Sequence, residues 1–158
     1  MRKDDQYFLK LAVKKAVQGV CKKGGGPFGA IIVKDGEIIA RAHNEVIKLN
    51  DPTAHAEVLA IRRACKKLAT FQLKGCVIYS SCEPCPMCLG AIYWARPLRV
   101  VFASPKEHAH LAGFDDDLIY CEISKPHSER KIGFKLLELK NAKAPFEAWE
   151  KKDCKTKY

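Results

Sequence analysis

Residues 76–103 read CVIYSSCEPCPMCLGAIYWARPLRVVFA and predict a strand, a helix and a second strand in succession. The apolar runs at the two ends, 76–80 and 99–103, have the length of strands, and Pro84 or Pro86 marks the start of the helix between them. Strands joined by a helix are typical of a sheet with parallel neighbours that helices cover. This segment therefore predicts an α/β fold.

Further elements are predicted upstream of this segment. An apolar stripe with a period of about 3.6 residues indicates a helix over residues 6–22. Residues 28–42 contain two runs rich in Ile and Val on either side of Asp35-Gly36, a pair typical of a tight hairpin turn. Asp51-Pro52 predicts the N-cap and the first residue of another helix.

Weaker patterns follow downstream. Residues 108–111 and 145–152 predict two short helices, and residues 113–117 predict a loop. Residues 134–139 alternate enough to predict a fifth strand. We therefore expect one domain spanning residues 1–158. Its fold class is α/β, a three-layer α/β/α sandwich with a mixed sheet of about five strands.

The composition is that of an ordinary globular domain. Of 158 residues, 47% are hydrophobic and 29% are charged, which argues against a disordered chain, a collagen-like repeat or a coiled-coil rod. No apolar run reaches the roughly 18 residues that a membrane span needs, and the N-terminus, MRKDD, is charged. We therefore expect no membrane span, no signal peptide, a cytoplasmic location and reduced thiols at the eight cysteines.

A net charge of +10 raises the question of a nucleic-acid partner. The excess lies at the two ends, residues 1–23 and 125–158, whereas residues 24–124 carry equal numbers of acidic and basic side chains. Lysine supplies most of the positive charge, although phosphate and base contacts favour arginine. The distribution therefore favours a solvated surface over a nucleic-acid interface.

Two short motifs carry the candidate chemistry. His55-Ala56-Glu57 is followed, after 26 residues, by Pro84-Cys85-Pro86-Met87-Cys88. One imidazole and two thiolates are a suitable set of ligands for Zn²⁺, and three protein ligands leave a fourth tetrahedral position for water, as in catalytic zinc sites. A helix start at the cysteines favours their thiolate forms, because the positive end of the helix dipole lies there.

Helix starts also explain how His55 and Glu57 share one site. Residues two apart point about 200° apart around a helix and cannot face one centre from its flank. Over the open end of the first turn both side chains reach the same point, so we expect the metal between two helix N-termini, at the carboxyl ends of the strands. Glu57 then lies beside the metal-bound water as a proton shuttle rather than a ligand.

Other interpretations of the cysteines stay open. A Cys-x-x-Cys pair alone is typical of structural zinc or a redox pair, and the spacing of Cys82, Cys85 and Cys88 is that of an iron–sulfur run without its fourth cysteine. Structural zinc requires a fourth protein ligand, for which Cys82 or Cys76 is available. The upstream His-x-Glu favours catalytic zinc, because the combined pattern is that of nucleobase deaminases.

Longer segments carry a resemblance that extends from about residue 7 to residue 158: GGPFGA (25–30), NDPTAHAE (50–57), SCEPCPMCLGAIYWARP (81–97), GFDD (113–116), PFEAW (145–149) and the terminal Tyr158. By these segments the chain resembles the cytidine-deaminase-like zinc hydrolases, and among them the bacterial guanine deaminases. The resemblance implies hydrolysis of guanine to xanthine and ammonia. It also implies Zn²⁺ held by His55, Cys85 and Cys88, with Glu57 as the catalytic acid and base.

The resemblance further implies a set of substrate contacts. Asp116 would reach the exocyclic amine, with Asp115 and Asp117 as alternatives among three adjacent aspartates. The residues implied to bind or line the purine are Asn44, the backbone of Ala56, Phe28 and Trp94. A homodimer is implied as well, in which the C-terminal segment crosses to a second subunit and brings Tyr158 into its pocket.

Rival functions remain open at this point. A tRNA adenosine deaminase shares the zinc motif and suits the positive charge. A deaminase of guanosine or of another aminated heterocycle is a closer rival to a guanine deaminase. A non-catalytic module stabilised by zinc would need four protein ligands and would not need Glu57.

Overall fold

The computed structural model describes residues 4–22 and 25–157. The chain divides into two compact units, Met1–Asp116 and Asp117–Tyr158. The first unit contains both metal motifs and every strand found in the described residues. Within these same ranges, no helix is both long and apolar enough to cross a membrane.

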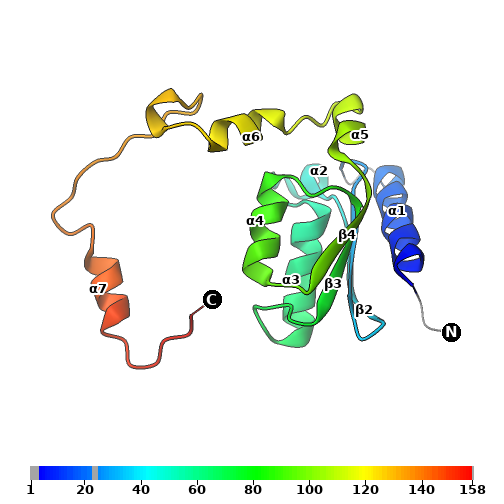
Figure 1. Ribbon diagram of the computed structural model, residues 1–158, viewed down its shortest axis with the longest axis horizontal. Coiled ribbons are helices and arrows are strands. Elements are labelled where there is room, and N and C mark those ends of the chain that lie inside the picture. The colour runs from blue at the N-terminus through cyan, green and yellow to red at the C-terminus, as the bar shows by residue number, and fades with distance from the viewer. Residues whose placement is uncertain (1–3, 23–24, 158) are drawn as a thin grey trace. The chain divides into compact units, whose positions relative to one another are not determined.

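A four-stranded mixed sheet forms the centre of the first unit (Figure 1). Its strands are β1 (Gly29–Lys34), β2 (Glu37–His43), β3 (Cys76–Cys82) and β4 (Arg99–Ser104), in the order β2-β1-β3-β4. β1 pairs antiparallel with both β2 and β3, whereas β3 and β4 are parallel. The predicted strand–helix–strand segment thus supplies the parallel pair.

The hairpin between β1 and β2 turns at Asp35 and Gly36, as predicted. Both residues have positive φ, 50° and 79°. Two central residues with positive φ form the turn whose twist matches that of the flanking strands, and glycine adopts this conformation without steric cost.

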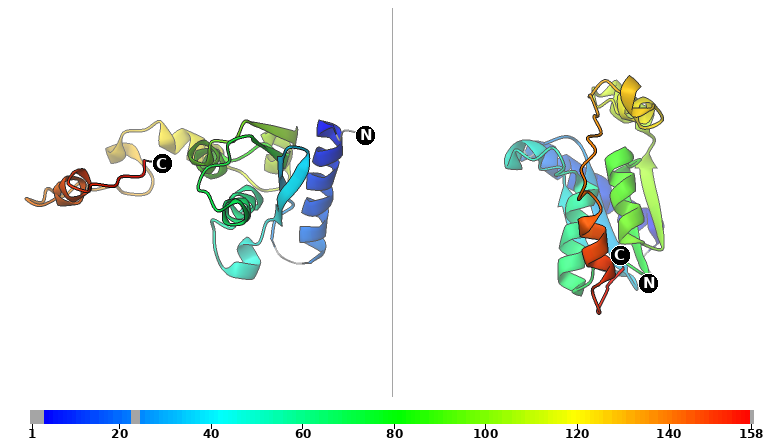
Figure 2. Two further views of the ribbon diagram at one scale, coloured as in Figure 1. Left: turned by 90° about the horizontal axis from the view of Figure 1, so that it is seen from below. Right: turned by 90° about the vertical axis from the view of Figure 1, so that its left-hand side faces the viewer.

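Helices cover both faces of this sheet (Figures 1 and 2). α1 (Asp5–Cys21) lies on one face, and α3 (Ala56–Leu68) and α4 (Pro86–Ala95) lie on the other. α1 approaches the sheet closely because Gly29 has no side chain: a Cβ atom there would lie 2.4 Å from the carbonyl oxygen of Ala12. The predicted three-layer α/β/α sandwich is therefore confirmed.

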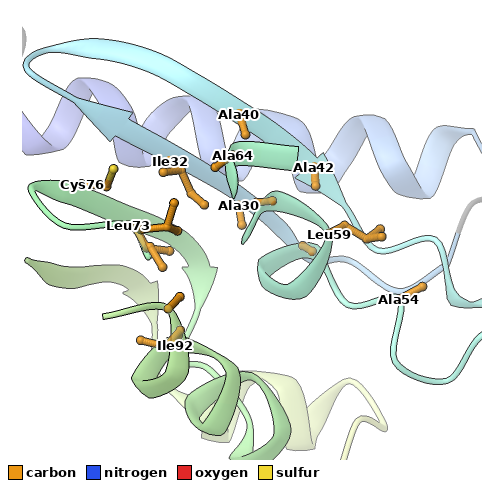
Figure 3. Close-up of a cluster of buried hydrophobic side chains, with 14 residues drawn as sticks. Ala30, Ile32, Ala40, Ala42, Ala54, Leu59, Ala64, Leu73, Cys76 and Ile92 are labelled. Carbon is orange, nitrogen blue, oxygen red and sulfur yellow. The ribbon is translucent and has the colours of Figure 1, made fainter. Parts of the chain in front are cut away.

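The larger core of the first unit lies between the sheet and helices α3 and α4 (Figure 3). Ile32 and Ile78 come from the strands, Leu59 from α3 and Ile92 from α4, and all four side chains are buried. Complete burial of one such aliphatic side chain contributes about 1.5–3 kcal/mol. This core therefore fixes the two helices that carry the metal motifs on one face of the sheet.

One edge of the sheet collects the residues expected at the site. Because β1 runs antiparallel to β2 and β3, the carboxyl ends of β2, β3 and β4 lie at the edge where β1 begins. Asn44 follows β2, Cys82 ends β3, and Phe28 precedes β1. The N–H of Gly29 donates to Oγ of Ser81 at 2.9 Å, which ties β1 to β3 at this edge.

The predicted fifth strand is wrong. Residues 134–139 form no strand, and the sheet has four strands in the described part of the chain. An alternating pattern forms a strand only where a neighbouring strand takes up its backbone hydrogen bonds. Residues 134–139 belong to the second unit, whose described residues contain no other strand with which to pair.

The predicted start of the helix at Asp51-Pro52 is also wrong, because α3 begins at Ala56. Oδ1 of Asp51 accepts hydrogen bonds from the backbone N–H and the hydroxyl of Thr53, at 2.8 and 2.7 Å. Asp51 therefore closes a turn instead of capping a helix. His55 takes the N-cap position, which places its side chain at the open end of the first turn.

Several short helices accompany these elements. In the first unit, α2 (Val46–Leu49) follows β2 and α5 (Lys106–Leu111) follows β4. The second unit contains α6 (Asp117–Ile123), a 3-10 helix over residues 127–129 and α7 (Ala144–Glu150). α5 and α7 correspond to the two predicted short helices, whereas α2 and α6 were not predicted.

The second unit exposes much of its apolar surface. Its exposed large hydrophobic side chains include Leu118, Ile123, Ile132, Phe134, Leu136, Leu137 and Phe146. An apolar surface of this kind is typical of a segment that binds another protein surface.

Candidate active site

Three side chains from two helix starts converge at this edge of the sheet. His55 is the N-cap of α3, Cys85 is the N-cap of α4, and Cys88 lies in the first turn of α4. The Sγ atoms of Cys85 and Cys88 each lie 3.5 Å from Nδ1 of His55. The nitrogen and the two sulfurs all lie within 4.8 Å of one another, so the structure brings the three predicted metal ligands together.

The separations in this cluster suit one tetrahedral zinc ion. Zn–S bonds of about 2.3 Å and Zn–N bonds of about 2.05 Å, at tetrahedral angles, place nitrogen and sulfur about 3.6 Å apart. The observed separations are 3.5 Å. Among the described residues, the cluster holds one histidine and two cysteines and no fourth ligand. This open arrangement is that of a catalytic site rather than a structural one.

The other two candidate cysteine ligands lie elsewhere. Sγ of Cys82 lies 3.7 Å from the carbonyl oxygen of Pro105, and Sγ of Cys76 lies 4.0 Å from that of Lys74. Burial is the main cause that raises the pKa of each thiol. Neither cysteine completes a four-ligand zinc site in this structure.

The contacts within the cluster favour a thiolate at Cys85. A hydrogen bond with Cys88 is the main cause that lowers the pKa of Cys85 to about 4, and His55 adds to this effect. The contact with Cys85, followed by burial, raises the pKa of Cys88. The hydrogen bond with Cys85 raises the pKa of His55. Thiolate is the form of cysteine that binds metal.

Glu57 lies beside the metal cluster and is only 4% exposed. Its Oε1 accepts a hydrogen bond from Oγ of Ser80 at 2.8 Å, and its Oε2 accepts one from Sγ of Cys88 at 3.4 Å. Burial raises the pKa of Glu57, so this carboxyl group takes up a proton more readily than an exposed glutamate does. Such a group is suited to moving protons between a nucleophile and a substrate.

Three of the expected substrate contacts lie at the same edge of the sheet. Asn44 is buried, and its backbone N–H donates to the carbonyl oxygen of Phe28 at 3.0 Å. Ala56 is fully buried, and its N–H, at the first position of α3, has no partner within the helix. The ring of Phe28 packs edge-to-face against that of Phe114, with centroids 5.1 Å apart.

The three adjacent aspartates have different surroundings. Asp116 is half-buried, and its charge, like that of Glu57, adds to the effect of burial in raising the pKa of Cys82. Asp115 is exposed and lies 3.4 Å from Nδ1 of His110. Asp117 begins α6 in the second unit. Of the two adjacent aspartates in the first unit, Asp116 is thus the one whose charge, like that of Glu57, helps to raise the pKa of Cys82.

The structure does not bring Trp94 to the cluster. Trp94 is 63% exposed near the C-terminal end of α4, about 13 Å along the helix from Cys85 at a rise of about 1.5 Å per residue. Tyr158 lies outside the described residues. The substrate roles of both residues stay predictions.

Two residues at the site were missed from the sequence. Ser80 binds Glu57 from β3, and its only signal was a polar residue at the end of an apolar strand. Phe114 packs on Phe28, and it belongs to the segment GFDD, in which only the aspartates drew attention. Both contacts join segments that are far apart in the sequence.

Comparison with known proteins places this geometry in a family. Residues 2–104 match the cytidine and deoxycytidylate deaminase zinc-binding region. The chain belongs to this deaminase family. The cluster of His55, Cys85 and Cys88 in this deaminase is consistent with the zinc that the family binds.

Two guanine deaminases are similar to this deaminase. A guanine deaminase of Bacillus subtilis is 57% identical over 153 residues, which are 97% of this chain and 98% of the relative. An X-ray structure of guanine deaminase from the same species has a TM-score of 0.97 and 55% identity, and 99% of each chain is covered. A structure of guanine deaminase from Nitrosomonas europaea has a TM-score of 0.68 and 29% identity, covering 73% of this chain and 66% of that one.

The similarity to RNA-modifying relatives is less extensive. A tRNA-specific adenosine deaminase of Aquifex aeolicus is 51% identical over 104 residues, which are 65% of this deaminase and 68% of the relative. The similarity to the Bacillus subtilis guanine deaminase, at 97% of the chain, necessarily includes most of the second unit.

Proposed function

We propose that this deaminase hydrolyses guanine to xanthine and ammonia. The observation that carries the proposal is its 57% identity to a guanine deaminase along 97% of the chain. A tRNA-specific relative matches only 65% of the chain, and the positive charge lies mainly in the two terminal regions rather than in the residues around the metal motifs.

One zinc ion per subunit is held by His55, Cys85 and Cys88 in this proposal. The fit of these donors to a tetrahedral ion supports it. When bound, Zn²⁺ lowers the pKa of a coordinated water and so supplies a nucleophile at neutral pH. Thiolate ligands persist in a reducing compartment, which supports a cytoplasmic location.

Glu57 is the proposed proton carrier. It accepts a proton from the attacking water and delivers it to the ring nitrogen beside the amino-bearing carbon. It then moves the second water proton to the departing amine, so that guanine and water give xanthine and ammonia. The hydrogen bond from Ser80 to Oε1 holds this carboxyl group in place during both transfers.

The remaining substrate contacts are proposed from the edge of the sheet. Asn44 and the N–H of Ala56 hydrogen-bond the purine, and Phe28 packs against its ring. Asp116 accepts a hydrogen bond from the exocyclic amine. Its half-buried position, in contrast to the exposed Asp115, supports this choice.

We also propose a homodimer in which the C-terminal segment of one subunit completes the pocket of the other, with Tyr158 and Trp94 as contributing residues. The exposed apolar side chains of the second unit support this proposal, because such surface is ordinarily covered by a partner. In this proposal, the second unit becomes part of a single folded domain only when the dimer has formed.

The test is ammonia release by purified, zinc-loaded protein with four substrates in parallel: guanine, guanosine, a tRNA anticodon stem that contains adenosine, and cytidine. We expect release from guanine alone. Glu57→Gln should keep zinc and the fold and lose about a hundredfold or more in kcat, because loss of general acid–base catalysis alone costs about 10²–10⁴.

The other outcomes are informative. Release from guanosine or from the RNA in preference to guanine would replace the proposed substrate. Full activity in Glu57→Gln would remove the carboxylate from the mechanism. A monomer in solution that retains full activity would contradict the completed-pocket proposal.

A further inference from the structure

A buried polar segment lies at the end of β2, outside the metal cluster. His43, Asn44 and Glu45 are 7%, 4% and 8% exposed. Burial of three consecutive polar side chains costs free energy unless each of them has hydrogen-bonding or charged partners. The hydrogen-bond and ion-pair partners of these three side chains therefore show what holds the segment in place.

The side-chain amide of Asn44 has one orientation. Its Oδ1 accepts hydrogen bonds from the backbone N–H groups of Gly26 and Val46, each at 3.2 Å. The reverse orientation would set amide N–H donors against backbone donors. The backbone at Gly25 approaches Oδ1 of Asn44 closely because Gly25 has no side chain. A Cβ atom there would lie 2.0 Å from this oxygen. Nδ2, an amide donor, is thus the side-chain atom left to bind a hydrogen-bond acceptor on a substrate.

His43 holds the backbone of Asn44. Nδ1 of His43 lies 3.0 Å from the carbonyl oxygen of Asn44. Because a carbonyl oxygen only accepts, Nδ1 donates in this contact. The side chain packs against Gly19 of α1, where a Cβ atom would lie 2.8 Å from the Cβ of His43. The imidazole is therefore fixed between α1 and the segment that carries Asn44.

Glu45 ties the same segment to α3. Its Oε2 accepts a hydrogen bond from Nη2 of Arg63 at 3.1 Å, and its Oε1 lies 3.6 Å from Nε2 of His43. Nη1 of Arg63 donates to the carbonyl oxygen of Arg41 in β2 at 2.8 Å. α3 is the helix that begins at the metal cluster, so these contacts join the segment that carries Asn44 to that helix.

We infer that His43 and the Glu45–Arg63 ion pair are positioning residues for substrate recognition, which hold the amide of Asn44 at a fixed place relative to α3. The inference rests on the proposed function, in which Asn44 binds the purine. A network that only stabilises the fold would act equally with or without the Asn44 side chain. A positioning network acts on substrate affinity and only through Asn44.

The test is a double-mutant cycle. Ammonia release from guanine is measured for His43→Ala and Arg63→Ala, each alone and combined with Asn44→Ala. We expect a rise in KM of about tenfold for His43→Ala and about threefold for Arg63→Ala, with kcat within about twofold, because loss of binding common to ground and transition states raises KM alone. In the Asn44→Ala background, either substitution should change kcat/KM by less than about twofold.

Two controls accompany the cycle. Arg62→Ala removes the adjacent arginine, which is exposed and lies 3.8 Å from Asp51, and should leave KM unchanged. His43→Gln keeps a side-chain N–H donor and should recover part of the affinity. Arg63 is partly exposed, with 43% of its side chain accessible, so Arg63→Ala tests the network even if His43→Ala fails to fold. Melting temperature and zinc content are recorded for every variant.

Equal effects in the presence and absence of the Asn44 side chain overturn the inference, and so does an unchanged KM in both single variants. If the wild-type protein releases no ammonia from guanine, the proposed function fails, and the same cycle is measured by equilibrium dialysis of labelled guanine in proteins that carry Glu57→Gln. Coupled losses of affinity then support the positioning network, whereas absence of guanine binding in Glu57→Gln overturns it.

Discussion

Oε2 of Glu57 lies 3.4 Å from Sγ of Cys88, although the two residues are 31 positions apart in the sequence. The contact exists because both residues occupy the first turns of helices, α3 and α4, that begin at the same edge of the sheet. The proposed proton carrier is thereby placed against a proposed metal ligand. The predictions below test the groups around this contact.

Replacement of a cysteine ligand should remove the metal. Cys85→Ser is expected to reduce bound zinc from about one equivalent to below about 0.1, because the hydroxyl of serine is not deprotonated under conditions in which the thiol of Cys85 is. Zinc is measured by elemental analysis of the purified protein. The matched control is Cys82→Ser, which should keep its zinc. If Cys82→Ser lost zinc as completely as Cys85→Ser, the site would have four protein ligands.

Removal of the Ser80 hydroxyl should impair catalysis without loss of zinc. Ser80→Ala leaves Oε1 of the buried Glu57 without its 2.8 Å hydrogen bond, and hydrogen bonds to charged groups contribute about 1.5–3 kcal/mol. We expect kcat to fall about tenfold or more with KM little changed. Steady-state kinetics with zinc content recorded in parallel measure this. An unchanged kcat would show that Ser80 does not hold the carboxyl group during turnover.

The adjacent aspartates should differ in effect. Asp116→Asn is expected to lower kcat/KM for guanine about a hundredfold, because it replaces a charged acceptor at the exocyclic amine. Asp115→Asn should change kcat/KM less than about twofold, since Asp115 is exposed and pairs with His110. Steady-state kinetics with guanine measure kcat/KM for both variants, and the two values are compared. The reverse ranking would transfer the role to Asp115.

The link from α1 to the sheet should depend on pH. Asp5 forms two hydrogen bonds with Arg99, at 2.8 and 2.9 Å, and accepts one from the hydroxyl of Tyr79 at 2.6 Å. The hydrogen bond with Arg99, and then that with Tyr79, lowers the pKa of Asp5 from 3.8 to about 2. A folded-state pKa below the unfolded value stabilises the protein above the unfolded value, and the gain is lost as the pH falls through the folded value.

Asp5→Asn should therefore lower the melting temperature by about 2–4 °C at pH 6, because an exposed ion pair contributes up to about 1 kcal/mol after solvent screening. The difference from the wild type should shrink between about pH 4 and pH 2. Calorimetry across this range measures it. Asp4→Ala is the comparison variant. Asp4 accepts a hydrogen bond from the N–H of Tyr7 and so caps α1, whereas Asp5 links α1 to Arg99 and Tyr79 of the sheet. A difference for Asp5→Asn that stayed constant down to pH 2 would contradict the assignment.

Local pattern was sufficient for most elements of the first unit. Asp35-Gly36 required a tight hairpin because few other pairs adopt two positive φ values, and Pro86 marked the start of α4 because proline fits the first turn of a helix. Asp51-Pro52 misled because the carboxylate of Asp51 closes a turn with Thr53, an alternative that local sequence does not distinguish from a helix cap. The predicted fifth strand over residues 134–139 does not form, because strand pairing depends on a neighbouring strand from elsewhere in the chain.

The sequence by itself determined the donor types of the candidate metal site, one histidine and two cysteines with a glutamate nearby, because helix starts present such side chains toward a common point. Only the tertiary structure decided which other groups meet them. Ser80 on Glu57, Phe114 on Phe28 and the network under Asn44 join segments with no shared periodicity. Such contacts are set by how the strands and helices pack, because close packing, rather than local pattern, fixes the neighbours of a side chain.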